Sequence, residues 1–149
     1  MKNINYIKNN NEQLIKELNN IINNDNISEI YEYCFNNFYN DKGEKYIGEM
    51  QNEMKEGKGI LYYNKDDEYK RKKYEGEFKN DKREGKGIIY WNYGDKYEGD
   101  WKNDERDGKG KLYWNDGDRY EGDYKNNKRE GKGIFYWNNG NRYEGDFKK

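Results

Sequence analysis

The chain has 149 residues, of which 40% are charged, 17% aromatic and only 31% hydrophobic, against ~45–50% in most soluble domains. This length fits one domain with a short extension, and the many aromatic residues argue against the disorder that such a composition otherwise indicates. The net charge of −1 excludes a strong electrostatic field that would attract nucleic acid. The chain has no histidine and a single cysteine, which excludes histidine catalysis, a zinc site and an internal disulfide.

Residues 1–45 form an N-terminal extension with a helical pattern. Apolar residues recur at helical spacing and predict two short helices or one bent helix within residues 12–38, packed against the beginning of the remaining chain; they include Leu14, Leu18, Ile21, Ile22, Phe35 and Phe38. The segment has no apolar signal-peptide core, and no window approaches the ~18 apolar residues of a membrane span. We therefore expect a cytoplasmic protein.

The rest of the chain, 46–149, is an array of repeats. The motif Tyr-x-Gly-(Glu/Asp)-aromatic begins at residues 74, 97, 120 and 143, a period of 23 residues. A weaker copy begins at Tyr46, has Met50 in the aromatic position and carries an insertion within residues 65–73. The array thus divides into 46–73, 74–96, 97–119, 120–142 and the partial copy 143–149. A fixed period of this length indicates one structural unit per repeat.

Each copy is expected to hold two antiparallel strands. Residues 74–78 alternate between rings or glycine and acids, the pattern of a half-buried strand. A polar link, 79–84, precedes a second strand at 85–91. The segment Asn92–Asp95 contains Gly94 and is a turn signal, because asparagine and glycine tolerate positive φ. The repeats therefore predict a meander of hairpins.

Comparison of the copies predicts which face of the sheet is packed. One column is apolar in every copy and should face the packed side; its members are Leu61, Ile89, Leu112 and Phe135. The neighbouring column contains Lys111 and should lie nearer water. The strand glycines, in Gly-x-Gly pairs such as Gly85 and Gly87, share the packed face. We expect aromatic rings of the adjacent strand to cover them, since a strand glycine often marks a close approach.

The motif, followed by Gly-x-Gly, an aromatic residue and a turn glycine, resembles the MORN (membrane occupation and recognition nexus) repeat over residues 46–149. The resemblance implies a mainly β fold: a single-layer, twisted antiparallel sheet of tandem β-hairpins, here with a short N-terminal α-helical segment. Copy 46–73 departs from the pattern and looks like a capping repeat. Similar arrays are attached to lipid kinases, histone methyltransferases and junctional membrane proteins, or stand alone as scaffolds at the cytoskeleton or membrane cortex.

The sequence contains no convincing catalytic, metal or cofactor site. Its Gly-Lys-Gly steps lie inside strands and lack the strand–loop–helix context of a phosphate loop. The paired acids recur in every copy, which indicates a solvated face opposite lysine and arginine. The only basic cluster, Lys70–Lys73, follows three acidic residues and is expected to be a solvated insertion. We therefore expect no enzyme activity.

The expected function is a protein-interaction scaffold that binds a partner helix or peptide along the aromatic face. The candidate binding residues are Tyr74, Phe78, Trp91, Tyr97, Trp101, Trp114, Tyr120, Tyr124 and Trp137. In the opposing interpretation these rings are used for internal packing. A phospholipid-associating module, a homodimer and a targeting fragment of a larger enzyme, such as a phosphatidylinositol phosphate kinase or a SET-type methyltransferase, stay open. Nucleic acid is not an expected partner.

Overall fold

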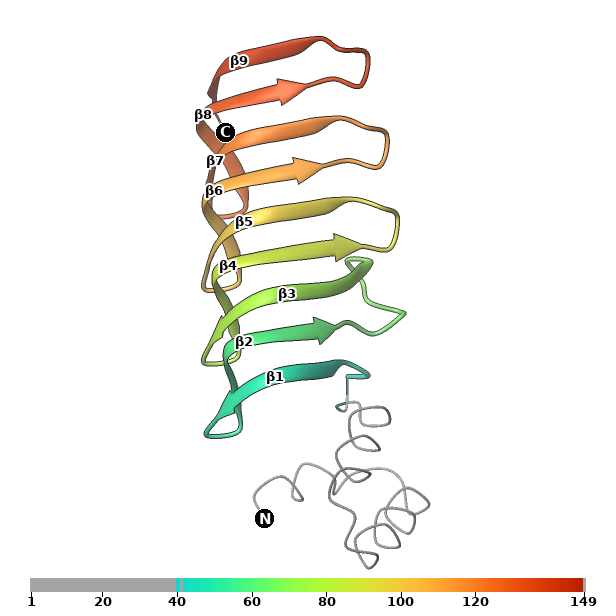
Figure 1. Cartoon of the computed structure of the whole chain (residues 1–149), viewed down its shortest axis with the longest axis vertical. Helices are drawn as coiled ribbons and strands as arrows, with labels where there is room; N and C mark the ends of the chain where they lie inside the picture. Colours follow the sequence, from blue (N-terminus) through green and yellow to red (C-terminus); the bar gives the residue numbers. More distant parts are fainter. Residues whose placement is uncertain (1–39, 41, 149) are drawn as a thin grey trace, which may run out of the picture. The chain divides into compact units, whose positions relative to one another are not determined.

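The structure, a computed structural model, describes residue 40 and residues 42–148. In this part the chain forms nine strands and no helix (Figure 1). The strands are β1 (Lys45–Gln51), β2 (Met54–Tyr62), β3 (Arg71–Lys79), β4 (Lys82–Trp91), β5 (Lys96–Lys102), β6 (Glu105–Tyr113), β7 (Arg119–Lys125), β8 (Lys128–Tyr136) and β9 (Arg142–Phe147).

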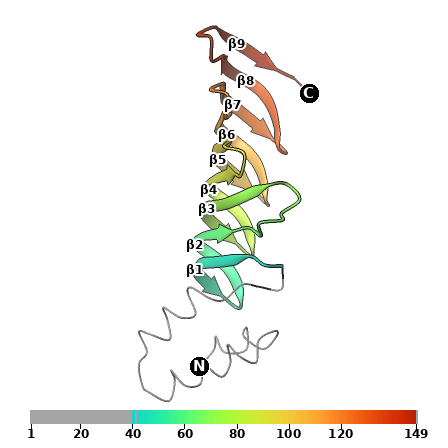
Figure 2. The ribbon, with the colours of Figure 1, turned by 90° about the vertical axis from the view of Figure 1, so that its right-hand side faces the viewer.

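The strands form one antiparallel sheet in the order in which they occur along the chain, β1 to β9. Figure 2 shows them following one another in a single layer, so the predicted sheet of tandem hairpins is confirmed. The chain divides after Lys45, and the unit 46–149 holds the array. The predicted helices at 12–38, and their packing on the first repeats, lie outside the described residues.

Two-residue turns close the hairpin within each repeat. Asn80 and Asp81, between β3 and β4, have φ angles of 47° and 67°. These positive values are those of a type I′ turn, whose twist matches that of the flanking strands. The predicted polar link 79–84 is therefore wrong in length: Lys79 ends one strand and Lys82 begins the next.

A four-residue turn, Asn92–Asp95, connects β4 to β5, as predicted. The N–H of Gly94 donates to the carbonyl oxygen of Trp91 at 3.2 Å, and the N–H of Trp91 donates to that of Asp95 at 3.0 Å. Gly94 has a φ of 104°, which is open to glycine and costly for other residues.

Side chains of the turns tie neighbouring repeats together. The backbone N–H of Arg83 donates to Oδ1 of Asp104 at 2.9 Å, so β4 is bonded to the next repeat's turn. At the opposite ends of the strands, the N–H of Asn115 donates to Oδ1 of Asp95 at 2.9 Å, and that of Asn138 to Oδ1 of Asp118 at 2.8 Å. The repeats 97–119 and 120–142 are therefore bonded to their neighbours at both ends of the strands.

A line of glycines crosses the sheet at right angles to the strands. Gly76 pairs with Gly87, which pairs with Gly99, and the line runs on to β9. A Cβ atom at Gly87 would lie closer than 3.0 Å to the Tyr74 ring, so the predicted covering of this glycine is confirmed. The expectation is wrong for Gly85, which lies at a β-bulge with a φ of 67° and faces the carboxylate of Glu77.

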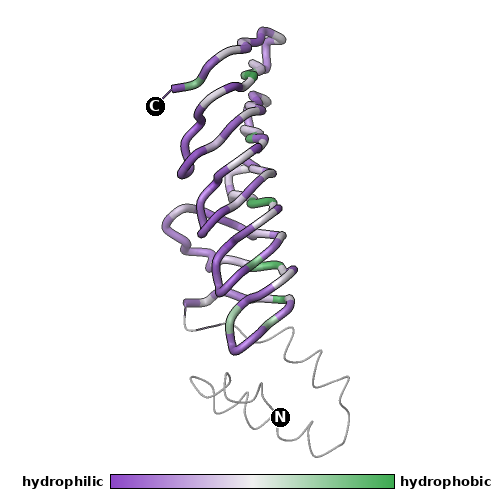
Figure 3. Tube along the Cα trace, turned by 90° about the vertical axis from the view of Figure 1, so that its left-hand side faces the viewer, coloured by the Kyte–Doolittle hydropathy of each residue, from purple (hydrophilic) through white to green (hydrophobic). Residues whose placement is uncertain are grey.

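The core is a thin layer on one face of the sheet. Leu61 and Ile89 are 7% and 1% exposed, while Leu112 and Phe135 are half-buried against the core, which agrees with the predicted apolar column. Lys111 of the neighbouring column is exposed, also as expected. Figure 3 shows only short hydrophobic segments along an otherwise hydrophilic trace. A core this thin depends on its aromatic rings.

Candidate interaction surfaces

The rings of the motif form the core of the array. Tyr74, Tyr97 and Tyr120 have no exposed surface. Each packs edge to face against the aromatic residue four positions later, as Tyr97 does against Trp101 with centroids 5.3 Å apart at 89°. Each also contacts the matching ring of the next repeat, as Tyr97 does Tyr124 at 5.1 Å. We call the side of the sheet that carries these rings the aromatic face.

Most of the predicted binding residues are therefore internal. Besides the three tyrosines, Phe78, Trp101 and Tyr124 are 3%, 5% and 4% exposed. The indole N–H of Trp101 donates to the carbonyl oxygen of Gly87 at 3.1 Å, a bond within the core. Periodicity identified the face on which these rings lie, but in the described array they offer almost no surface to a partner.

The remaining three predicted residues, Trp91, Trp114 and Trp137, form what we call the tryptophan row, at one border of the aromatic face. Trp91 and Trp114 are half-buried, and Trp137 is 42% exposed. Phe135 lies between two of them, 5.3 Å from Trp114 and 4.9 Å from Trp137. Tyr93, which is 53% exposed, stacks on Trp91 at 6.5 Å. This row, with Tyr93 beside it, presents partly exposed aromatic rings at the border of the aromatic face.

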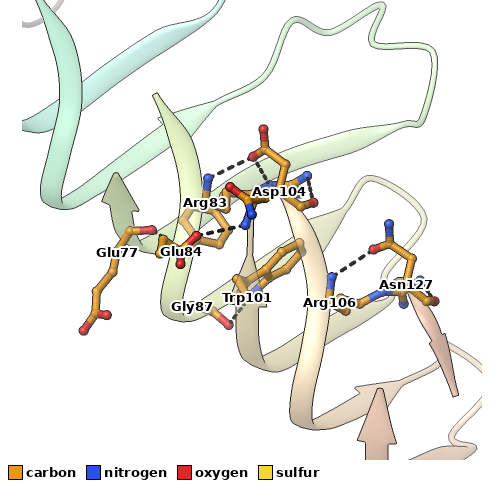
Figure 4. Close-up of polar contacts among 10 residues, drawn as sticks. Glu77, Arg83, Glu84, Gly87, Trp101, Asp104, Arg106 and Asn127 are labelled. Atoms are coloured by element: carbon orange, nitrogen blue, oxygen red, sulfur yellow. Dashed lines mark hydrogen bonds and ion pairs between the residues drawn. The ribbon is translucent and has the colours of Figure 1, made fainter. Parts of the chain in front are cut away.

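A column of arginines on the aromatic face was not anticipated from the sequence. The guanidinium of Arg83 lies 4.3 Å from the Trp101 ring centre (Figure 4). Arg106 lies 5.4 Å from Tyr97 and 5.2 Å from Tyr124. These arginines are 23 residues apart in segments that resemble solvated links. Their recurrence at the repeat period was the signal that could have revealed them.

The opposite side of the sheet, here the charged face, is a lattice of ion pairs. Directly paired residues include Lys109 with Asp123 and Lys132 with Asp146, the latter at 2.9 Å. Nearer the turns that connect successive repeats, cations lie over tyrosine rings, as Arg119 does over Tyr136 at 4.2 Å. The expectation that the repeated acids oppose lysine and arginine is confirmed.

A furrow follows the glycine line across the charged face from β3 to β9. Backbone glycines form its floor, and its walls alternate between lysines and acids. The acids also support the bulges: Oδ2 of Asp100 accepts the backbone N–H of Lys109 at 2.8 Å. Because the wall charges are paired with one another, the furrow has little net charge with which to attract a charged ligand.

The insertion before β3 is an ordered loop closed by Asp67. Its carboxylate accepts two hydrogen bonds from the Arg71 guanidinium, at 3.0 and 2.6 Å, and these bonds hold the pKa of Asp67 below its usual value. Lys73 pairs instead with Glu75 on the charged face. Two of the four cations of the basic cluster are therefore paired with carboxylates. Tyr69, at the end of this loop, is 64% exposed.

Burial raises the pKa of the core tyrosines. The effect takes the pKa of Tyr124 to about 12, and burial raises those of Tyr74, Tyr97 and Tyr120 as well. These hydroxyl groups stay protonated and serve packing: that of Tyr97 donates to the carbonyl oxygen of Asp100 at 3.0 Å.

Within the described part of the chain, no group of histidine, cysteine, aspartate or glutamate residues is arranged to hold a metal ion. Among the same residues, no helix has the length and apolar character needed to cross a membrane.

A single sheet of equal hairpins, with rings stacked over a glycine line, defines a β-hairpin repeat protein. The MORN repeat model matches residues 46–68, 74–96, 97–119 and 120–142, more than half of the chain. The chain belongs to the MORN repeat family. No curated protein matches it. MORN repeats are generally protein- or membrane-interaction modules and are not catalytic by themselves.

Proposed function

We propose that this chain is a non-catalytic scaffold that binds an amphipathic helix of a partner protein along the tryptophan row. The observation that carries this proposal is the contrast between the rings. The motif rings of repeats 74–96, 97–119 and 120–142 are packed to 0–5% exposure, whereas Trp137 is 42% and Tyr93 53% exposed. Aromatic residues that stay partly exposed in a contiguous row are unusual on a surface without a partner.

The spacing of the row suits a helix. Equivalent residues of successive repeats lie two strands apart, roughly 9.6 Å. Side chains seven residues apart on one face of a helix are separated by about 10.5 Å. Successive apolar side chains of a partner helix can therefore contact Trp91, Trp114 and Trp137 in turn. Tryptophan and tyrosine suit this role because each gives a large contact area with few rotamers to immobilise.

The test uses a fluorescent 21-residue amphipathic helical peptide with leucine along its apolar face. Replacing Trp114 and Trp137 by alanine should weaken its binding at least about tenfold, since interface aromatic residues often contribute 2 kcal/mol or more. The matched control, Ile134→Ala, removes a half-buried side chain from the charged face of β8 and should change the affinity less than about twofold. Equal affinity of the double variant and the wild type would contradict the proposal.

The proposal does not use Trp101 as a contact, because that ring is in the core. Association with phospholipid, as a module at the membrane cortex or cytoskeleton, is the alternative function, and co-sedimentation with phosphatidylserine vesicles tests it. A targeting role within a larger enzyme is compatible with the same surface. We place the protein in the cytoplasm, and light scattering of the purified chain tests whether it is a homodimer.

A further inference from the structure

We propose that the partner helix is acidic, and that Arg106 and Arg129 bind its carboxylates beside the tryptophan row. This inference rests on the proposed function and adds the chemistry of the partner. It follows from a difference between repeats at one turn position, from the rings that surround the two arginines and from their distance to the tryptophan row.

The first observation is that one arginine of the column has a carboxylate partner and the next does not. Nε of Arg83 donates to Oδ1 of Asp104 at 3.0 Å, and the two groups form an ion pair. The equivalent turn residue one repeat later is Asn127. Asn127 accepts two hydrogen bonds from Arg106 through neutral oxygens. Its Oδ1 accepts the backbone N–H of Arg106 at 3.0 Å, and its carbonyl oxygen accepts a hydrogen bond from Nη2 of Arg106 at 2.9 Å. The same backbone geometry is kept and the negative charge is lost (Figure 4).

The second observation concerns Arg129, the next residue of the column. Its guanidinium lies 5.4 Å from the ring of Tyr120 and 5.7 Å from that of Phe147. Among the described residues, no carboxylate lies within 4.0 Å of the guanidinium nitrogens of Arg106 or of Arg129. Aromatic faces attract a cation but leave its N–H groups free to bind an anion.

The two unpaired arginines belong to the same surface as the tryptophan row. The guanidinium of Arg129 is 5.9 Å from the ring of Trp114 and 5.9 Å from that of Phe135. Arg106 lies over Tyr124, whose ring packs 5.4 Å from that of Tyr120 beneath Arg129. A ligand that covers the exposed part of the row therefore comes beside both cations.

The electrostatics of this surface favour an anion. Burial lowers the pKa of the Arg106 guanidinium; Tyr124 and Tyr97 offset part of this effect, and repulsion from Arg83 and Arg129 adds to it. The group nevertheless stays charged at neutral pH because an arginine pKa is far above 7. A half-buried cation with like charges nearby and no counter-ion is costly, and a carboxylate that arrives with a partner relieves that cost.

The spacing again fits a helix. Arg106 and Arg129 are one repeat apart, roughly 9.6 Å, while acids seven residues apart on a helix are separated by about 10.5 Å. A peptide is favoured over an anionic membrane because both guanidinium groups lie among rings, whereas polybasic membrane elements present protruding lysines to many headgroups. The nearly neutral chain also lacks the net positive charge that draws a protein to a membrane.

Two forms of the 21-residue leucine peptide test the proposal by fluorescence anisotropy. One carries glutamate seven residues apart beside the apolar face, and the other carries lysine at those positions. The wild-type chain should bind the glutamate peptide at least about tenfold more tightly, with an affinity that falls as salt is added. Equal binding of the two peptides would overturn the proposal.

The decisive variant is Asn127→Asp, which supplies Arg106 with the counter-ion that Asp104 gives Arg83. It should weaken glutamate-peptide binding about fivefold or more, and Arg129→Gln should do the same. The matched control is Asn126→Asp, which adds the same charge one position earlier and should have less than about a twofold effect. In the converse variant, Asp104→Asn, Arg83 loses its carboxylate and the glutamate peptide should bind more tightly.

The outcomes separate the two proposals. If Trp114→Ala/Trp137→Ala abolishes peptide binding while Asn127→Asp and Asn126→Asp behave alike, the tryptophan row binds a helix but the acidic partner is wrong. If neither set of variants changes binding, both proposals fail. If phosphatidylinositol bisphosphate vesicles bind in an Arg129-dependent manner while the glutamate peptide does not, the anion is a lipid headgroup and the peptide assignment is overturned.

Discussion

The rings of Tyr120 and Tyr124 pack edge to face, with centroids 5.4 Å apart at 86°, but only one of their hydroxyl groups has a hydrogen-bond partner. That of Tyr120 donates to the carbonyl oxygen of Asp123 at 3.1 Å. That of Tyr124 is buried and has no hydrogen bond within the described structure. The equivalent positions of the preceding repeats hold Trp101, which uses its N–H, and Phe78, which has no polar group.

Tyr124→Phe should therefore stabilise the array by about 1 kcal/mol, because it removes a polar group that is buried without a partner. Tyr120→Phe is the matched control and should destabilise the array by about 1 kcal/mol, since it leaves the Asp123 carbonyl oxygen without its donor. Urea unfolding followed by circular dichroism measures both changes. Equal losses in the two variants would contradict this account of the Tyr124 hydroxyl group.

Gly87→Ala should destabilise the array by about 1–3 kcal/mol, the usual cost of overpacking a core. The new methyl group would meet the ring of Tyr74, which is fully buried and has no free space to move into. Ile88→Ala changes the neighbouring residue, whose side chain lies on the charged face, and should cost less. Thermal melting compares the two, and a larger loss for Ile88→Ala would contradict the packing of rings over the glycine line.

Alternation and turn chemistry sufficed to predict the hairpins from the sequence, because both act within a few residues. The apolar column that contains Leu61 and Ile89 was found by comparing copies, since equivalent residues meet the same environment in each repeat. The sequence predicted a link around Asn80 and Asp81 that is longer than the two-residue turn in the structure. Both residues take positive φ without glycine, and a run of polar residues does not show where a strand begins again.

The candidate site was harder to predict, because alternation indicates a face but not what covers it. Trp101 and Trp137 lie on the same face, yet one is 5% and the other 42% exposed. The difference arises from neighbouring repeats: Tyr74, Tyr97 and Arg83 all pack on Trp101. These contacts join residues from different strands, so no single repeat contains the information.

High pH should unfold the array through its tyrosines. Burial raises the pKa of Tyr124 to about 12, while an unfolded tyrosine titrates near 10. The folded state thus favours the protonated hydroxyl group, and this contribution to stability is complete below about pH 10 and is lost as the pH rises through 12. Circular dichroism should be lost as the buried tyrosines ionise. Exposed rings such as Tyr69 and Tyr93 also contribute to the absorbance change, so only the ionisation of every tyrosine with the sheet intact would show that the core rings are accessible.

The last prediction separates two acids that occupy the same motif position. Oδ2 of Asp100 accepts a hydrogen bond from the backbone N–H of Lys109 at 2.8 Å. This bond lies beside the bulge at Gly108, where φ is 118°. Among the described residues, the carboxylate of Asp146, in β9, has only the side chain of Lys132 as a partner, and both of these side chains are more than half exposed.

Asp100→Ala should therefore cost about 1–2 kcal/mol, because it leaves a backbone donor at the bulge without its acceptor. Asp146→Ala should cost less than about 0.5 kcal/mol, since an exposed ion pair contributes little. Urea titrations in low and high salt distinguish the two contributions. The loss of stability in Asp100→Ala should persist in high salt, because a hydrogen bond to the backbone depends on its geometry more than on a charge that salt screens. A loss that disappears in salt would mean that Asp100 acts only through its ion pair with Lys86.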